Sequence, residues 1–600
     1  MEDSGPTLAS GPSSNSNPPI MEESSAKLFC CHWVRHRIPL AHREEFYHIL
    51  QMTGPLLLSR ILNYLLPFVI TMFCGRLGNE VLAGYGLACA TINVTTAATG
   101  GGLALACDTL VSQTFGGKNL QRVGVILQRS VLILLLFCLP CWAMLLNTQS
   151  ILLALGQEPE VARIAQLYVI AYLPAVPVSH LFNQTPTMCF CVQGIILPQM
   201  YTAAVANIAN VVTNYILLYW MDLGVIGSAA ANTLSQLYIC SFLFAYICWK
   251  KLYVKTWGGW TTEALQEWGS YMKLAIPSTL MLCFEWWIYE LGGFLAGMLS
   301  EVDLAAQHVV IMLAFINYMF PLGIQAAACV RVGNALGAGD AAGAILTSKV
   351  SLALSGSMAV IQGIMLISTK TVIGFMFTSD EQIIDLVSQL LNVYCVLQFF
   401  DGLCVCMGII LGTGQQKIAA MANLITYYCV GLPLGISLMF AAGLRVVGFW
   451  LGLLICVILQ STFFITVIFR LNWKKMTEKA GHMNNGRVSR KFYCACFHTQ
   501  TVNGYMSVSA EGQGDLRGSN WTPEVQKEDG SPRALLSTTQ LVLRRGLTVL
   551  SAIVILAVGT SVHLLLPLPI SSWSNLSVDW SNTTFTTTYP PELGPSTVLI

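Results

Sequence analysis

The chain has 600 residues, of which 54% are hydrophobic and only 10% are charged, and its mean hydropathy is +0.63. Soluble domains carry about 25% charged residues, so this chain could not cover the surface of a soluble globule with charge. The composition excludes a soluble enzyme and a disordered scaffold, and the net charge of +1 excludes a basic nucleic-acid binder. It favours a polytopic helical membrane protein.

The chain begins with a polar stretch rich in Ser, Pro and Gly, and we expect residues 1–45 to form a disordered cytoplasmic N-terminus. Thirteen apolar runs follow, each close to the length of about 20 residues that crosses about 30 Å of hydrocarbon. A polar segment rich in Gly, Ser and Lys separates the last two runs and is typical of a flexible loop. The predicted spans are 52–74, 84–112, 124–146, 164–189, 199–220, 225–248, 271–298, 305–329, 350–368, 386–411, 418–440, 446–469 and 546–566.

The positions of Lys and Arg indicate the orientation of these spans. If the N-terminus is cytoplasmic, the inside connections carry most of the basic residues, and the outside connections carry only Arg76, Arg163, Lys370 and Arg445. An odd number of spans then places the C-terminal tail outside, where Asn575 and Asn582 begin N-x-[ST] sequons and are glycosylation candidates. We therefore predict a multi-pass plasma-membrane protein with a cytoplasmic N-terminus and an extracellular C-terminus.

The chain resembles itself at an offset of about 221 residues, which relates Pro55 to Pro277 and Gly227 to Gly448. Each half contains six spans, and an even number gives the halves the same orientation, so the axis that relates them lies along the membrane normal. The predicted domains are an N-lobe at 46–250 (spans 1–6), a C-lobe at 251–470 (spans 7–12), a flexible cytoplasmic loop at 471–540, a thirteenth span at 541–567 and an extracellular tail at 568–600.

Glu285 is the leading candidate for function, because an ionisable group at the centre of the bilayer costs at least about 2.5–3.5 kcal/mol. Counted from Lys273, it lies about 18 Å into its span. Tyr289, one turn further on, could donate a hydrogen bond to the carboxylate, and Trp286 and Trp287 could stack on an organic cation. Burial disfavours the charged carboxylate, so a proton and a cation could compete here. The alternative is a buried acid that holds two helices together.

Asp401 also lies near mid-depth, where it could bind a proton or substrate or could make a packing hydrogen bond. Its repeat partner is His180, which could titrate or could be a satisfied core histidine. Glu290 lies nearer the outer end, about 140° around the helix from Glu285, and is expected to face elsewhere or toward the outer vestibule.

Two further charges lie within the predicted spans. Asp108 ends the second span near the cytoplasmic surface, and a structural pairing with a basic loop residue is favoured there. Arg60 lies about eight residues into the first span, and its long side chain could snorkel to the inner surface. Asn63, the repeat partner of Glu285, lies one turn from Arg60.

No cofactor or metal is expected. Most of the 20 Cys lie inside apolar runs, as Cys138, Cys240 and Cys456 do, and are expected to be small core residues. The Gly-rich stretches at 100–102 and 333–339 lack the Gly-Lys-Ser/Thr ending of a phosphate loop, and no ATP-binding motif occurs. We therefore expect a proton gradient, rather than an enzymatic reaction, to supply the energy.

Several motifs together resemble those of the MATE family, the multidrug and toxin extrusion proteins, and most closely the vertebrate organic cation/proton exchangers. They are Ala106–Gln113, Gly124–Ser130, Glu285-Trp286-Trp287, Arg331–Gly339 and Leu471–Lys475. The resemblance covers about residues 45–475 and again 538–560. It implies two six-helix lobes around a central cavity, efflux of organic cations in exchange for protons, and the extra helix that vertebrate members carry.

The resemblance also implies roles for single residues. Glu285 matches the essential carboxylate of the seventh span, Glu290 a second acid there, Asp401 the acidic position of the tenth span, and Tyr318 an aromatic residue of the eighth. Three positions depart from the vertebrate pattern: Met312 stands where a Glu is usual, Leu411 where an Arg is frequent, and Arg60 has no expected counterpart. With one acid fewer and one cation more, we expect a narrower or less cationic substrate set.

The sequence thus predicts an all-α polytopic antiporter, acting as a monomer in the lipid bilayer, that exports small organic cations by alternating access. Glu285 and Asp401, with Glu290, are the predicted proton and cation sites, and the predicted cavity residues are Trp286, Trp287, Tyr289, Tyr318, Asn63 and His180. Two alternatives stay open: a Na⁺-coupled or neutral- or anionic-substrate exporter of the same fold, and a lipid-linked flippase.

Overall fold

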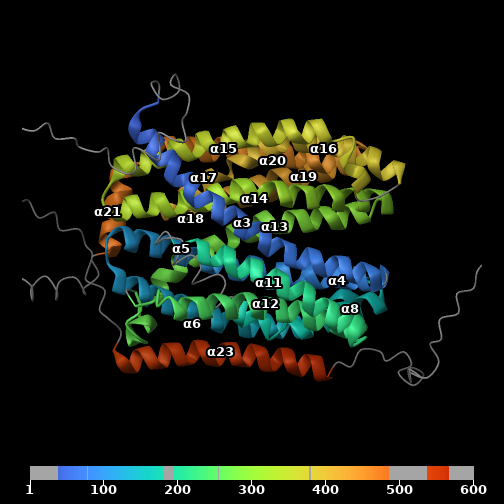
Figure 1. The fold of residues 1–600 in the computed structure, drawn as a ribbon, viewed down its shortest axis with the longest axis horizontal. Helices are drawn as coiled ribbons and strands as arrows, with labels where there is room; N and C mark the ends of the chain where they lie inside the picture. The colour runs from blue at the N-terminus through green and yellow to red at the C-terminus, as the bar shows by residue number, and fades with distance from the viewer. Residues whose placement is uncertain are drawn as a thin grey trace, which may run out of the picture.

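The computed structural model describes residues 38–77, 79–179, 195–254, 256–376, 380–484 and 537–565. These residues are almost entirely helical and include no strand, and their long helices lie side by side along the long axis of the molecule (Figure 1). Eleven of the described helices are long and apolar enough to cross a membrane. The prediction of an all-α polytopic membrane protein is therefore confirmed.

The N-lobe is built from α3 to α12. Long helices dominate it, and the π-helical turn η1 joins α4 and α5 into one predicted span. The elements are α3 (Leu40–Leu77), α4 (Asn79–Ile92), η1 (Asn93–Ala97), α5 (Ala98–Gly116), α6 (Leu120–Leu146), α7 (Thr148–Ala154), α8 (Pro159–Tyr172), α9 (Ala175–Val178), α11 (Leu197–Tyr215), η3 (Ile216–Trp220) and α12 (Gly224–Trp249).

The C-lobe repeats this arrangement from α13 onward, and α23 follows it. The elements are η4 (Thr262–Leu265), α13 (Trp268–Gly297), α14 (Glu301–Gly337), α15 (Ala341–Thr369), η5 (Ile373–Met376), α16 (Glu381–Asp401), η6 (Gly402–Cys404), α17 (Val405–Gly412), α18 (Gln416–Asn423), η7 (Leu424–Gly431), α19 (Leu432–Ile436), η8 (Ser437–Ala441), α20 (Arg445–Arg470), α21 (Trp473–Asn484) and α23 (Thr538–Leu565).

Two predicted spans differ from the other spans in the structure. The fourth, 164–189, corresponds to α8 and α9 and then runs beyond the described residues. The seventh is α13, a continuous helix of 30 residues that carries Lys273, Glu285 and Glu290. It is not one of the eleven helices that are long and apolar enough to cross a membrane.

Two segments expected to lack structure are helical. Residues 40–45, placed in the disordered N-terminus, form the start of α3, and the side chain of Glu45 is held there by Arg331. Residues 473–484, placed in the flexible loop, form α21. Trp473 and Met476 of α21 pack against the C-lobe core, and Ala480 is buried in it. Both segments are polar on average, and each folds because one face contacts the bundle.

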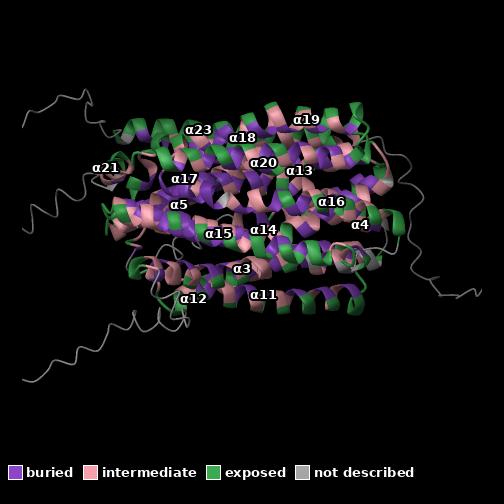
Figure 2. Ribbon diagram, turned by 90° about the horizontal axis from the view of Figure 1, so that it is seen from above, coloured by how far each residue is buried: buried purple, intermediate pink, exposed green. Residues whose placement is uncertain are grey.

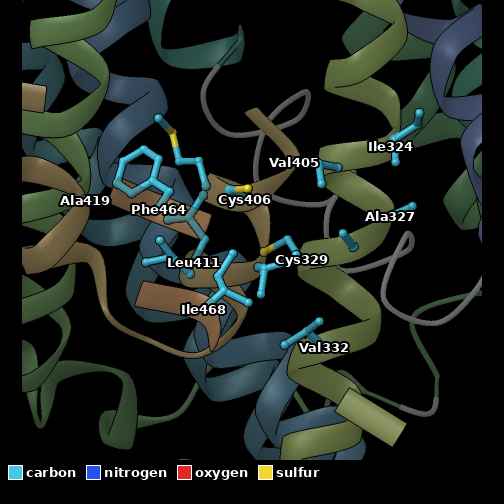
Figure 3. Packing of buried hydrophobic residues seen from close by; sticks show 14 of the residues in the cluster. Ile324, Ala327, Cys329, Val332, Val405, Cys406, Leu411, Ala419, Phe464 and Ile468 are labelled. Atoms are coloured by element: carbon cyan, nitrogen blue, oxygen red, sulfur yellow. The ribbon is translucent and has the colours of Figure 1, made fainter. Parts of the chain in front are cut away.

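The core of the C-lobe lies between α14, α17, α18 and α20. Figure 3 shows Val332 and Cys329 of α14 beside Cys406 and Leu411 of α17. Buried residues fill the middle of the bundle, and exposed residues follow its outer helices (Figure 2). Cys138, Cys240 and Cys456 are buried and unpaired, as expected for small core residues.

The two lobes meet along α5 of the N-lobe and α13 and α14 of the C-lobe, and we call this contact the seam. Its close contacts are reciprocal: Gly116 lies against the backbone of Asn334, and Gly337 lies against the backbone of Gln113. The offset of about 221 residues relates Gly116 to Gly337 and Gln113 to Asn334. Such a pattern is what a two-fold axis produces, because each partner presents the same patch to the other. The predicted internal repeat is therefore visible in the packing.

The seam is closed at one end of the bundle. Near the C-terminus of α5, Thr109 donates a 3.0 Å hydrogen bond to the carbonyl of Leu411, and Gln113 donates a 2.9 Å hydrogen bond to the carbonyl of Gly412. Arg331 forms an ion pair with Glu45 across the lobes at 2.5 Å. We call this end the basic end, because its loops and helix ends carry Lys118, Lys250, Lys251 and Arg331.

Helix α23 lies at the edge of the N-lobe, beside α6 (Figure 1). Gly559 allows close approach to Ala143, and Asn147 donates a 2.9 Å hydrogen bond to the carbonyl of Gly559. Most side chains of α23 are exposed, as expected for a helix that faces lipid on three sides.

Candidate functional site

Glu285 lies in the middle of α13 and is buried, with 8% of its surface exposed. The hydroxyl of Tyr318, on α14, donates a 2.9 Å hydrogen bond to Oε1 of Glu285. Oε2 is also buried and has no hydrogen-bond partner among the described residues. The predicted donor was Tyr289, one turn along α13; the hydrogen bond that the structure shows comes from Tyr318 on the neighbouring helix. One oxygen of the carboxylate is thus held, and the other is available to a proton or a ligand.

Asp401 is the last residue of α16 and is half-buried. Its charge interacts with that of Glu285, and Tyr289 interacts electrostatically with both carboxylates. Three elements, α13, α14 and α16, therefore bring the two predicted acids and two tyrosines together. Two like charges that share a low-dielectric site disfavour simultaneous ionisation, so the pair is suited to holding one positive charge or one proton at a time.

Aromatic side chains adjoin the acids. Trp286 is 37% exposed, and Nε1 of Trp287 is buried without a hydrogen-bond partner in the described structure. Tyr427, from η7, interacts electrostatically with Glu285, Asp401 and Tyr289. Aromatic faces attract organic cations, so this environment complements the negative charge.

A polar network beside the acids was not predicted from the sequence. Asn317 of α14 donates hydrogen bonds to the Tyr394 hydroxyl (3.2 Å) and to Oε1 of Gln398 (3.4 Å). Gln362 of α15 donates a 2.9 Å hydrogen bond to the carbonyl of Asn317. The sequence contained a signal for this network, because an amide side chain inside an apolar span requires a hydrogen-bond partner. This network joins α14, α15 and α16 and orients the helix that carries Asp401.

Other predicted residues lie apart from this group. Glu290 is exposed on α13, and Asn63 is half-buried on α3 of the N-lobe, where its Oδ1 has no hydrogen-bond partner among the described residues. His180, Asn575 and Asn582 lie outside the described residues. Of the positions that depart from the vertebrate pattern, Met312 is half-buried and Leu411 belongs to the C-lobe core.

Asp108 does not have the partner that the sequence suggested. It interacts electrostatically with Arg60 of α3, a residue of the first span, rather than with a basic loop residue. Arg60 is half-buried there. The two intramembrane charges of the N-lobe are thus opposite in sign, whereas the two carboxylates of the C-lobe carry like charges.

A cavity of about 1000 Å³ lies at the basic end, beside the closed seam, and is lined by residues of both lobes. Its lining includes Lys118, Lys250, Asn334 and Asp340 and none of the residues around Glu285. The cavity and the Glu285 group therefore occupy different levels of the bundle. Within the described residues no cluster of three or more His, Cys, Asp or Glu side chains could hold a metal ion.

When the chain is compared with known protein families, one family model matches it twice. The MatE model matches residues 55–216 and again residues 277–436. The two matches fall in the N-lobe and the C-lobe, and they begin at Pro55 and Pro277, the residues that the internal repeat aligns. The match is therefore independent support for the duplication.

Related proteins resemble the chain over most of its length. Multidrug and toxin extrusion protein 1 of Danio rerio is 46% identical, over 90% of this chain and 94% of that protein. The Homo sapiens protein of the same name is 45% identical, over 87% and 94%. Multidrug and toxin extrusion protein 2 of Mus musculus is 49% identical, over 73% and 76%.

Solved structures share the fold. The eukaryotic MATE transporter AtDTX14 superposes with a TM-score of 0.71 at 26% identity, covering 74% of this chain and 99% of that chain. The Vibrio cholerae MATE transporter VcmN in its bent form gives a TM-score of 0.63 at 16% identity, covering 74% and 100%. With the duplicated family match, the two-lobe fold and the close relatives, the chain belongs to the MatE family of multidrug and toxin extrusion transporters.

Proposed function

We propose that this transporter exports organic cations in exchange for protons by alternating access. The observation that carries the proposal is the pairing of the buried Glu285 with the half-buried Asp401. One oxygen of Glu285 is held by Tyr318, and the other has no partner in the described structure. The aromatic residues around the pair fit an organic cation rather than an anion. The relatives are named multidrug and toxin extrusion proteins, which agrees with this substrate class.

Competition between the proton and the organic cation for one site couples their transport in opposite directions. A proton on Glu285 removes the charge that attracts the organic cation, and a bound cation opposes protonation. Each ligand changes the equilibrium between conformations only through its differential affinity for them, so competition for one site couples the two fluxes. Asp401 strengthens this competition because it interacts electrostatically with Glu285.

The closed seam favours one assignment of this structure to a conformation of the transport cycle. Contacts join the lobes at the basic end, so Glu285 would be reached from the opposite end in this conformation. An excess of Lys and Arg marks the cytoplasmic side of membrane proteins. We therefore assign the basic end to the cytoplasm, the opposite end to the outside of the plasma membrane, and this conformation to the outward-facing state.

The test is uptake of a labelled quaternary amine into membrane vesicles with an imposed proton gradient. Uptake should follow the proton gradient and should be lost in Glu285→Gln. Glu381→Gln is the matched control, because Glu381 has the same side chain but is exposed at the start of α16, the helix that carries Asp401. Unimpaired exchange in Glu285→Gln would rule out the mechanism.

The same vesicles address the alternatives. Replacing the proton gradient by a sodium gradient tests Na⁺ coupling, and labelled neutral or anionic compounds and a labelled lipid test the other cargoes. Because Arg60 adds a positive charge and Met312 is neutral, we expect the set of accepted cations to be narrow; a panel of compounds of different net charge measures this.

A further inference from the structure

A carboxylate outside the Glu285 group lies buried between the lobes. Asp108 of α5 is 6% exposed, and its Oδ1 is buried without a hydrogen-bond partner among the described residues. A buried carboxylate oxygen without a partner is costly and rare, so such a group calls for an explanation. The charges that act on Asp108 come from Arg60 of α3, and the polar groups of Tyr271 on α13 and Cys329 on α14 also interact with it.

Asp108 lies in the part of the seam where residues of one repeat meet their counterparts in the other. The internal repeat relates Asp108 to Cys329, and these two residues interact with each other. One turn further along α5, Ser112 lies against Gly333, and the repeat relates these two residues as well. Residues that meet their own repeat partners lie on the axis that relates the lobes. Asp108 therefore lies one helical turn from the point where Ser112 and Gly333 meet on the pseudo-two-fold axis, at which the lobes must part.

Along the axis of the helix bundle, Asp108 lies between the basic end and the Glu285 group. Asp108 precedes the end of α5, at Gly116, by about 12 Å, and Glu285 follows the start of α13, at Trp268, by about 25 Å. In α5, α13 and α14, Asp108 is the single carboxylate between the level of Glu285 and the basic end. An organic cation that moves along these three helices from the basic end therefore reaches Asp108 before it reaches Glu285.

Opening of the basic end changes what surrounds Asp108. The seam contacts of Gly116, Gly337 and Gly333 must separate, and Cys329 then moves away with the C-lobe. Arg60 and Asp108 belong to the same lobe, so they stay together, and the guanidinium continues to favour the charged carboxylate. Oδ1, which has no hydrogen-bond partner among the described residues in the closed seam, becomes accessible to an ammonium group.

We propose that Asp108 is a second cation-binding site, which captures the organic cation from the basic end when the seam opens and passes it to Glu285. The proposal rests on the export of organic cations proposed above. It assigns the two carboxylates to two stages: Asp108 receives the cargo on the inner side, and Glu285 exchanges it for a proton. In the closed seam Asp108 is buried, so a cation does not reach it there.

The experiment measures KM for a labelled quaternary amine in inside-out and in right-side-out membrane vesicles that contain the full chain. Asp108→Asn should raise KM about tenfold from the basic-end face, which corresponds to about 1.4 kcal/mol, and less than twofold from the opposite face. Asp108→Glu should restore most of the affinity. Cys329→Ala, at the repeat-related position, should leave KM unchanged from both faces.

The outcomes separate the site from the transport mechanism. Glu285→Gln should abolish exchange measured from either face, and its failure to do so would contradict the proposed function whatever Asp108 does. An equal rise in KM from both faces, a rise confined to the outer face, or no rise in Asp108→Asn would overturn the second site. Because KM does not depend on the amount of protein, a poorly expressed variant still gives a decisive result.

Discussion

Tyr318 of α14 donates a 2.9 Å hydrogen bond to Glu285 of α13, and so links two helices through the carboxylate proposed to exchange a proton. A hydrogen bond donated to a carboxylate favours its charged form. In Tyr318→Phe the proton should therefore bind Glu285 more tightly, and the pH at which cation uptake is half-maximal should rise. The measurement is uptake of a labelled quaternary amine between pH 5 and 9. Tyr428→Phe is a control, because Tyr428 packs edge-on against Phe284 on the same helix; an equal shift in both variants would argue against a direct effect.

The ion pairs that close the basic end should differ in strength. Arg331 contacts Glu45 with two hydrogen bonds of 2.5 Å, Thr347 adds a third of 2.7 Å, and the Glu45 side chain is only 10% exposed. Glu45→Gln should lower the free energy of unfolding by about 2 kcal/mol, because Arg331 loses a charged partner in a partly buried site.

Glu267 provides the comparison for Glu45, since the internal repeat relates the two residues. Its contacts with Arg122 and Arg129 are longer, at 3.7 and 3.6 Å, and its side chain is 48% exposed. Glu267→Gln should therefore cost less than about 1 kcal/mol. Thermal unfolding of the two purified variants measures the difference. Equal destabilisation, or a larger effect at Glu267, would contradict the ranking.

The seam glycines should be intolerant of a side chain. A Cβ on Gly337 would overlap the backbone carbonyl of Gln113, and backbone atoms have no room to move aside. Gly337→Ala should prevent the seam from closing and reduce transport at least about tenfold. Gly86→Ala is the control, because a Cβ on Gly86 meets nothing within 4 Å. Wild-type rates in Gly337→Ala would show that the seam does not close in the cycle.

Helix α23 should contribute to stability rather than to transport. The Arg545 guanidinium lies 4.2 Å from the centre of the Trp268 ring and donates a 2.9 Å hydrogen bond to the carbonyl of Leu265. Arg545→Ala should loosen this attachment at a cost of about 1 kcal/mol while KM for the labelled cation stays unchanged. A combined thermal-unfolding and uptake experiment checks both statements; a changed KM would place α23 in the transport pathway.

The sequence alone identified features that depend on single residues within the membrane spans or on the spacing between residues. Glu285 and Asp401 were identified because a charge at mid-depth is expensive, and the structure brings them together. The repeat was identified from Pro and Gly positions, and the two family matches begin at the aligned prolines. These features depend on local sequence and on spacing.

Features that depend on contacts between distant helices were less accessible. Periodicity on α13 suggested Tyr289 as the partner of Glu285, but Tyr318 reaches the carboxylate from α14, and the crossing of the two helices decides this. The start of α3 and helix α21 were predicted to lack structure because their average polarity hides the few side chains that pack on the bundle. The pairing of Asp108 with Arg60 likewise requires the placement of α3 beside α5.

The reciprocal seam has a consequence for how such a transporter arises. Its contacts have the form of an interface between two identical subunits, so a protein half as long could have assembled through the same patch. In that homodimer an aspartate near the axis would lie close to its own copy, and two carboxylates would repel one another. Fusion into one chain removes this restriction, because the position that the repeat relates to Asp108 is now occupied by Cys329. A single negative charge beside the axis of symmetry is thus a property that only the fused, diverged protein can have.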